Sequence, residues 1–325
     1  MAITYTQRLE LARTANDISG LVRAQTPNTR RKNKALKSLE YFARAYFPEV
    51  YYLPFSDIHK QVIQRLEETI TKGKCFALAL PRGSGKTSLC ETAILWAVLG
   101  GHCRCAVLLG CNASRASGLL KDLFSYLCYN DLLLQDFPEL IAPFRKCDGN
   151  SRLLCSYNMD GSQLGCFTNA STIAFPSSDA TGGEARITAT GLTGGNLRGS
   201  AYVTKSGEKV RPDLVLIDDP QSREVASSPD QIADRLKTIN ADVLGMAGAG
   251  KKISCLVTCT VIEPNDLAER LLDKKQSPEF NAYRFSLISD IPKNITLWDE
   301  WNALRLQDDT LKTANIFYAE HKEEM

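Results

Sequence analysis

Residues 80–88 read Leu-Pro-Arg-Gly-Ser-Gly-Lys-Thr-Ser, and these residue types suit the binding of a triphosphate. Glycines at 83 and 85 let backbone N–H groups turn toward phosphate oxygens, and a helix expected to start near Thr87 adds its dipole. Lys86 can reach the β- and γ-phosphates, and the hydroxyl of Thr87 can ligate Mg²⁺. A strict loop has glycine where this chain has Leu80, so the motif is a variant. A strand, turn and helix with chance glycines is the alternative.

Two adjacent carboxylates end an apolar run at residues 213–220, Asp-Leu-Val-Leu-Ile-Asp-Asp-Pro. Alternate residues of a strand point to opposite faces, so Asp218 and Asp219 can have different roles. We expect Asp218 to hold Mg²⁺, directly or through water, and Asp219 to polarise the attacking water, a role usually given to glutamate. Two carboxylates at a buried strand end are costly without a cation. A helix N-cap or a surface acidic pair is the alternative.

Thr258, Cys259 and Thr260 stand at the end of another apolar run. Small hydroxyl side chains there can bond the attacking water or the γ-phosphate and transmit its loss to a helix expected at 265–272. Threonine also favours strands in general, and that is the alternative reason for its presence.

Two arginines are candidates for stabilising a phosphoryl-transfer transition state, where an added positive charge is worth roughly 10³–10⁵ in rate. Arg82 lies within the loop itself and can act in its own subunit. Arg198 ends the stretch 191–199, Gly-Leu-Thr-Gly-Gly-Asn-Leu-Arg-Gly, which can present it to a neighbouring subunit. A surface arginine without a role is the alternative for Arg198.

The elements that must position these residues are the strands and helices of a parallel sheet. Four short apolar runs lack polar alternation, which is typical of strands covered on both faces. The runs are 75–80, 105–109, 214–217 and 253–257, and the helices between them are expected at 87–98, 112–129 and 229–244. The pattern predicts a doubly wound α/β sheet.

Other segments give further expectations. Residues 1–50 predict helices, and Ser56 or Asp57 can cap a helix that ends near Gly73. Residues 167–173 predict a hairpin that turns at Asn169, and the stretch 181–200 predicts a long glycine-rich loop. Residues 23–39 contain six basic and no acidic side chains, which indicates either a solvated segment or an arm that contacts phosphates.

The composition excludes several classes of protein. The chain has 325 residues, of which 44% are hydrophobic and 23% charged, so it is globular in composition. Its apolar runs fall far short of the roughly 20 residues of a membrane helix, and we expect no secretory signal. The formal net charge of +2 gives no strong electrostatic footprint for nucleic acid. Eleven cysteines in a chain of this kind indicate reduced thiols, and three histidines make a zinc site unexpected.

Together, the motifs at 81–88, 193–199, 213–220 and 258–267 resemble those of the large terminase subunit of tailed bacteriophages. Residues 47–59 resemble that family's lead-in to the phosphate loop, and 317–325 its segment before a second domain. The resemblance implies a P-loop NTPase of the RecA-like/ASCE type, with a central, mostly parallel sheet flanked by helices and a small helical lid subdomain. It implies an ATPase that uses Mg²⁺ and moves double-stranded viral DNA into a procapsid.

The resemblance also implies roles for individual residues. The phosphates of ATP are bound by Arg82, Gly83, Ser84, Gly85, Lys86, Thr87 and Ser88. Thr87 and Asp218 hold Mg²⁺, and Asp219 is the catalytic carboxylate, as in the part of the family that has aspartate there. Arg82 is the loop arginine, Arg198 the candidate trans-acting finger, and Thr258 to Thr260 the coupling motif. Phe55 and His59 stand at the adenine; many members have glutamine in place of His59.

The implied organisation is a helical N-terminal part at 1–50, an ATPase core at 51–290, and a lid or linker at 291–325 toward a C-terminal nuclease domain. We expect no nuclease activity from residues 1–325. The implied partners are double-stranded DNA, the small terminase subunit, the portal protein and further copies in a ring, without a membrane. The implied location is the host cytoplasm, with transient docking on the procapsid. A DNA-stimulated helicase or translocase, and a nucleotide-gated DNA-binding module without turnover, are the alternatives.

Overall fold

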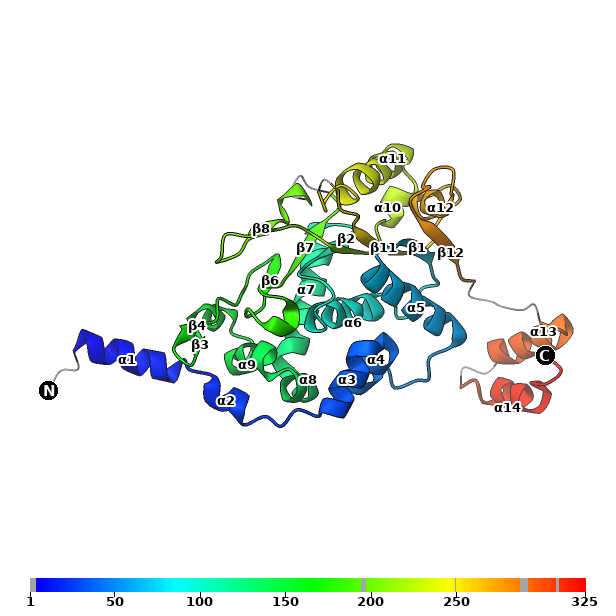
Figure 1. The fold of residues 1–325 in the computed structure, drawn as a ribbon. Helices are drawn as coiled ribbons and strands as arrows, with labels where there is room; N and C mark the ends of the chain where they lie inside the picture. Colours follow the sequence, from blue (N-terminus) through cyan, green and yellow to red (C-terminus); the bar gives the residue numbers. More distant parts are fainter. Residues whose placement is uncertain (1–3, 194–196, 249, 287–291, 308–309) are drawn as a thin grey trace. The chain divides into compact units, whose positions relative to one another are not determined.

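A computed structural model describes residues 4–193, 197–248, 250–286, 292–307 and 310–325 (Figure 1). The chain divides into two compact units, Met1–Phe285 and Ser286–Met325. In the described part of the chain, no helix combines the length and the apolar character needed to cross a membrane.

The first unit is built on an eight-stranded sheet with the order β12-β1-β11-β10-β2-β7-β6-β5. Neighbouring strands from β12 to β7 are parallel, and β6 and β5 are antiparallel at one edge. The strands are β1 (Cys75–Ala79), β2 (Cys105–Gly110), β5 (Phe167–Thr168), β6 (Thr172–Ala174), β7 (Arg186–Gly191), β10 (Leu214–Asp218), β11 (Ser254–Cys259) and β12 (Asn281–Arg284). The four predicted apolar runs are therefore confirmed as adjacent parallel strands. Short pairs outside this sheet are β3 (Asn158–Met159) with β4 (Ser162–Gln163) and β8 (Tyr202–Val203) with β9 (Lys209–Val210).

Helices cover both faces of this sheet, as the prediction of a doubly wound arrangement requires. Figure 1 shows α5, α6 and α7 on one side and α10, α11 and α12 on the other. The helices are α1 (Tyr5–Ala15), α2 (Ser19–Arg23), α3 (Thr29–Lys37), α4 (Leu39–Tyr46), α5 (Asp57–Lys72), α6 (Lys86–Leu99), α7 (Ala113–Tyr129), α8 (Asp131–Asp136), α9 (Pro138–Cys147), α10 (Arg223–Ala226), α11 (Pro229–Lys237) and α12 (Leu267–Leu272). Alternate residues of one strand enter opposite cores: Leu216 packs with α6, whereas Ile217 packs with α11.

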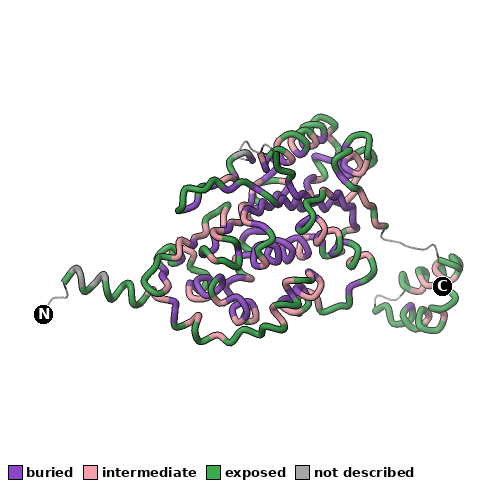
Figure 2. The backbone as a smooth tube through the Cα atoms, in the orientation of Figure 1, coloured by how far each residue is buried: buried purple, intermediate pink, exposed green. Residues whose placement is uncertain are grey.

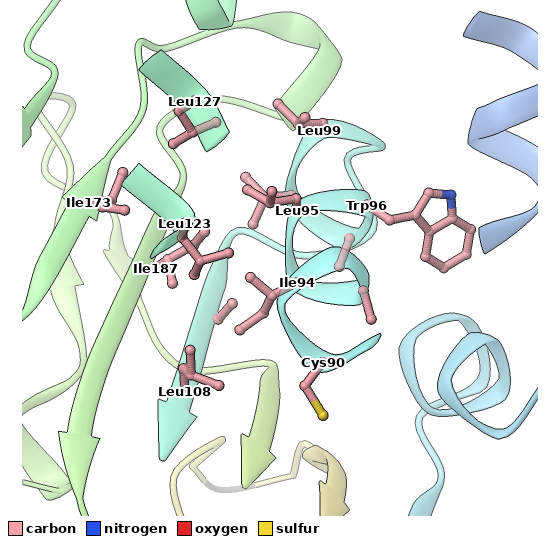
Figure 3. Close-up of a cluster of buried hydrophobic side chains, with 14 of the residues drawn as sticks. Cys90, Ile94, Leu95, Trp96, Leu99, Leu108, Leu123, Leu127, Ile173 and Ile187 are labelled. Atoms are coloured by element: carbon pink, nitrogen blue, oxygen red, sulfur yellow. The ribbon is translucent and has the colours of Figure 1, made fainter. Parts of the chain in front are cut away.

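Helix α6 lies in the centre of the larger core, and almost all of its residues are buried (Figure 2). Figure 3 shows Ile94 directed toward the sheet and Trp96 directed the other way. The indole Nε1 of Trp96 donates to the carbonyl oxygen of Ala35 at 2.9 Å. The N-terminal helices α3 and α4 thereby complete the outer layer of the core, since Ala35 and Phe42 are fully buried.

The basic stretch at 23–39 is largely occupied by contacts within the chain. Arg31 forms an ion pair of 2.6 Å with the fully buried Asp136. Lys32 lies over the ring of Phe137, and Lys34 over that of Tyr41. These contacts hold α3 against its neighbours, so α3 is not a free arm in the folded chain.

Two predicted segments need correction. The stretch 181–200 is not one long loop, because its middle forms β7. The strand alternates buried and half-buried residues, and its threonines and glycine concealed this pattern in the sequence. Gly191 is required there, since an added Cβ would lie 2.5 Å from the backbone nitrogen of Ala113. The helix expected at 229–244 consists of two elements. Helix α11 ends at Lys237, and a π-helix follows at Thr238–Val243.

The other local expectations are confirmed. Strands β5 and β6 form the predicted hairpin, and the side chain of Asn169 accepts from the backbone N–H of Ser171 in its turn. Ser56 rather than Asp57 caps α5, which ends at Gly73 in the left-handed conformation. The helix expected at 265–272 begins at Leu267, with Asp266 as its N-cap.

The second unit contains α13 (Ile295–Gln307) and α14 (Lys312–His321). Trp298 joins the two helices: its ring lies 6.1 Å from that of Tyr318, and its Nε1 donates to the carbonyl oxygen of Met325 at 3.1 Å.

Candidate functional site

The loop between β1 and α6 turns through two glycines in the left-handed region. Gly83 has φ +79° and Gly85 has φ +67°, and Gly85 immediately precedes the first turn of α6. A residue with a Cβ is strained in this conformation, which explains glycine at both positions. The ammonium of Lys86 bends back over the loop and donates to the carbonyl oxygen of Pro81 at 3.0 Å.

Leu80, the departure from a strict loop, has a structural explanation. Its backbone N–H donates to the carbonyl oxygen of Cys259 at 2.9 Å, so the contact between β1 and β11 continues one residue past the strand. Its side chain is buried in the core. The loop therefore starts after Leu80, and Gly83 and Gly85 form its turn.

The two carboxylates at the end of β10 point to different partners. Asp218 is fully buried; its Oδ2 accepts from the hydroxyl of Thr87 at 2.8 Å and its Oδ1 from that of Thr258 at 3.3 Å. Asp219 Oδ1 accepts from the hydroxyl of Thr260 at 3.1 Å. The structure therefore brings the loop, the acidic pair and both predicted threonines together. Cys259 faces away, and its thiol lies near the carbonyl oxygen of Leu78.

Asp219 adopts a conformation that few residues with a side chain tolerate. Its φ is +45°, in the left-handed region where aspartate and asparagine are the most common exceptions to glycine. Burial raises the pKa of Asp219; the positive charge of Lys86 opposes the rise and the negative charge of Asp218 adds to it. A raised pKa moves a carboxylate toward the range useful for accepting a proton.

A cavity of about 310 Å³ lies between the loop and Asp219. It is lined by Arg82, Gly83, Ser84, Gly85, Lys86, Thr87, Asp219, Gln221, Thr260 and Ile262. Arg82 is exposed on its rim. A second cavity, of about 410 Å³, lies along α12 and β12, and none of its lining residues has a predicted role.

The predicted adenine residues lie next to the loop. His59 Nε2 is 3.3 Å from the carbonyl oxygen of Ser84, and the rings of His59 and Phe55 lie 6.0 Å apart. Phe55 is itself buried, with the guanidinium of Arg44 over its ring. Ser88 is half-buried on α6, and its carbonyl oxygen accepts from the hydroxyl of Tyr51. Arg198 belongs to a short 3₁₀ turn, Leu197–Gly199; its side chain and residues 194–196 lie outside the described part of the chain.

Sequence reasoning missed three side chains at this site, Arg115, Gln221 and Glu91. Arg115, in the first turn of α7, donates from Nη2 to Thr87 Oγ1 at 3.2 Å and to Asp218 Oδ2 at 3.3 Å. Gln221 donates to the carbonyl oxygen of Thr260 and to Asp266, the N-cap of α12. Arg115 follows β2 closely in the sequence, and the carboxyl ends of parallel strands meet at one edge of the sheet. This position could have predicted that Arg115 lies near the site.

Glu91 is a buried carboxyl one turn along α6 from the loop. It is 3% exposed, and its Oε1 has no hydrogen-bond partner among the described residues. Burial raises its pKa to about 8, and the negative charges of Asp122 and Asp218 add to the rise. At neutral pH this carboxyl therefore keeps its proton in the folded chain.

This pKa makes the stability of the chain dependent on pH. An unfolded glutamate ionises near pH 4.5, whereas Glu91 in the folded chain ionises near pH 8, so stability falls as the pH rises through this range. Glu91→Gln cannot ionise and is expected to be more stable than the parent by up to about 5 kcal/mol near pH 9, from about 1.4 kcal/mol per pKa unit. The difference should disappear near pH 4.5. Thermal unfolding across this pH range checks it, with the exposed Glu279→Gln as control; a constant difference contradicts the assignment.

No protein-family model and no curated protein matches the sequence. Among solved structures, the chain is similar to the large terminase of bacteriophage HK97, with a TM-score of 0.42 and 14% identity. The match covers 84% of this chain and 48% of that terminase, so the chain spans about half of its length. A likeness at this level assigns no activity or partner.

Proposed function

We propose that this chain binds ATP with Mg²⁺ between the loop at 82–87 and the carboxylates of Asp218 and Asp219, and that it hydrolyses the ATP. The observation that carries the proposal is the 2.8 Å contact between the hydroxyl of Thr87 and the buried carboxylate of Asp218, beside a cavity lined by Lys86. This contact joins the two motifs that nucleotide hydrolysis requires, although they are more than a hundred residues apart in the sequence.

The donor set fits magnesium. A hydroxyl and a carboxylate are oxygen ligands, which Mg²⁺ prefers, and a bound nucleotide supplies further oxygens. Asp218 is fully buried, and a buried carboxylate requires a cation or several hydrogen bonds to offset its desolvation. When bound, Mg²⁺ neutralises charge on the phosphates and stabilises the charge that develops during transfer.

The residues of the chain have separate tasks in this proposal. Lys86 turns its ammonium from the carbonyl oxygen of Pro81 to the phosphates, and the backbone N–H groups of the glycine turn and the start of α6 bind phosphate oxygens. Asp219 orients the attacking water and accepts its proton, held in place by the hydroxyl of Thr260. Arg82, on the rim of the cavity, places positive charge at the outer phosphate. His59 and Phe55 stand toward the base.

The coupling of hydrolysis to movement is proposed to run through Gln221. The amide nitrogen of Gln221 donates to the carbonyl oxygen of Thr260 and to the carboxylate of Asp266. Its amide oxygen accepts from the backbone N–H of Leu267 in the first turn of α12. A displacement of Thr260 when the γ-phosphate leaves therefore acts directly on α12.

We further propose that the work done is the movement of double-stranded DNA into a viral procapsid. The order and spacing of the motifs support this class of motor over a helicase, since the sequence has one phosphate loop and one Asp-Asp strand end. The proposed partners are a ring of identical subunits, a portal protein and a small terminase subunit in the host cytoplasm. The proposal makes ATPase activity depend on DNA, and steady-state hydrolysis with and without double-stranded DNA tests it.

A trans-acting role of Arg198 predicts that activity depends on assembly. The activity per subunit should rise with protein concentration, because Arg198 reaches the site of a neighbour only in an assembled ring. Arg198→Ala is expected to lose roughly 10³-fold in turnover, the loss typical of a missing finger. Mixing Arg198→Ala with Lys86→Ala should restore activity, since the first variant supplies an intact Lys86 and the second an intact Arg198. Hydrolysis that is linear in concentration and unchanged in Arg198→Ala contradicts the trans role.

A further inference from the structure

Arg115 is held at the candidate site by two features of the chain around it. Asn112 caps α7 by accepting from the backbone N–H of Arg115 at 2.9 Å. Gly110, the last residue of β2, leaves room for the side chain: an added Cβ would lie 3.1 Å from Arg115 Cγ and 2.9 Å from the nitrogen of Ala116. The guanidinium therefore passes over the end of β2 and arrives at the oxygens of Thr87 and Asp218.

One nitrogen of this guanidinium contacts both oxygens that the proposed function gives to magnesium. Arg115 Nη2 lies 3.2 Å from Thr87 Oγ1 and 3.3 Å from Asp218 Oδ2. The side chain of Asp218 has no exposed surface, whereas that of Arg115 is 48% exposed. The pair thus supplies a positive charge to a carboxylate that is costly to bury alone.

The contact of Arg115 and a Mg²⁺ ligated directly by these two oxygens exclude each other. Magnesium holds its oxygen ligands at about 2.0–2.1 Å, so it requires the position that Nη2 approaches. Two cations that share these oxygens also repel each other in a partly buried site. One of them has to leave, and the half-exposed guanidinium has a path to solvent.

We propose that Arg115 is an internal cation that pairs with Asp218 and Thr87 when Mg²⁺ is not bound, and that it is displaced when Mg²⁺ enters with the nucleotide. Arg115 is in this sense a positioning residue. It holds the two magnesium ligands together between rounds of binding and lowers the affinity for the metal, which favours release after hydrolysis. The inference rests on the proposed function, because it needs the metal to bind at these oxygens.

Glu91 gives the displaced side chain a second partner. This carboxyl is buried one turn along α6 from Thr87, and one of its oxygens has no hydrogen-bond partner among the described residues. The positive charge of Arg115 already acts on Glu91, since it opposes the rise in the pKa of that carboxyl. An arginine that leaves Asp218 therefore stays near a carboxyl oxygen that has no other hydrogen-bond partner among the described residues.

The test compares the binding of ADP with Mg²⁺ to the binding of ADP with EDTA, both by calorimetry. Arg115→Gln is expected to bind Mg²⁺·ADP roughly tenfold more tightly than the parent, in the range usual for coupling between two ligands. Its affinity for ADP in EDTA should be unchanged or weaker, because no metal competes there. Arg152→Gln, an exposed arginine on another segment, is the matched control and should leave both affinities unchanged.

The outcomes separate this inference from the proposed function. If the parent binds Mg²⁺·ADP and Arg115→Gln binds it equally or less tightly, Arg115 assists the metal or a phosphate and the inference is overturned, while the proposed function stands. If the parent binds no Mg²⁺·ADP, the proposed function fails and this inference with it. Should Arg115→Gln fail to fold, Arg115→Lys replaces it: its compact ammonium lacks the planar fork, so the affinity for Mg²⁺·ADP should rise by a smaller factor, and an unchanged or lower affinity overturns the inference.

Discussion

Lys86→Ala is expected to slow ATP hydrolysis by roughly 10²–10³-fold and to weaken the binding of Mg²⁺·ATP. Lys86 lies on the wall of the cavity in the first turn of α6, and the residue is only 6% exposed. A charged donor that is aimed at developing negative charge is worth roughly 10²–10³ in turnover, and hydrogen bonds to charged groups are stronger than neutral ones. A coupled hydrolysis assay and a calorimetric titration with a non-hydrolysable ATP analogue measure both effects.

The fold of Lys86→Ala should survive, so that the loss can be attributed to the site. The ammonium contacts only carbonyl oxygens of its own loop in the described structure, and its removal takes away a charge that is costly to bury. Lys121→Ala, an exposed lysine on α7, is the matched control for the loss of a positive charge. Retained hydrolysis in Lys86→Ala would show that the nucleotide does not use this loop.

Asp219→Asn is expected to bind Mg²⁺·ATP as the parent does and to hydrolyse it roughly 10²–10⁴ times more slowly. Asparagine has the same shape, accepts the hydroxyl of Thr260 through its amide oxygen, and tolerates the left-handed backbone that this position requires. It cannot accept a proton, and the contribution of a general base lies in this range. The change therefore isolates the chemical step from binding.

Asp218→Asn provides the contrast within the same pair. Its side chain contacts Thr87 and the guanidinium of Arg115, so its loss should weaken binding in the presence of Mg²⁺ and leave binding in EDTA nearly unchanged. Equal effects of the two variants on binding and on turnover would contradict the division of roles between Asp218 and Asp219.

The centre of the fold could be predicted because its strands are covered on both faces. Strands β1, β2, β10 and β11 consist almost entirely of apolar residues, and short runs of this kind between helical patterns are typical of buried parallel strands. Strand β7 could not be predicted in this way. Its residues alternate between buried and half-buried, and the half-buried positions include threonines within a glycine-rich stretch.

The site was predictable where a motif lies on consecutive residues. The contact between Thr87 and Asp218 follows from two such motifs at the carboxyl ends of parallel strands. Arg115 belongs to no motif, and its position depends on the cap at Asn112 and on the absence of a Cβ at Gly110. The burial of Glu91 could not be predicted either. A glutamate in a helix is usually exposed, and only the packing around α6 buries this one.

The most direct test of the central claim is a crystal structure of the chain with Mn²⁺ and ATPγS, in which anomalous scattering locates the metal. The account predicts Mn²⁺ beside the oxygens of Thr87 and Asp218, with the phosphates within hydrogen-bond distance of Lys86. A nucleotide bound in the larger cavity along α12 and β12, with no metal between the loop and β10, would contradict it.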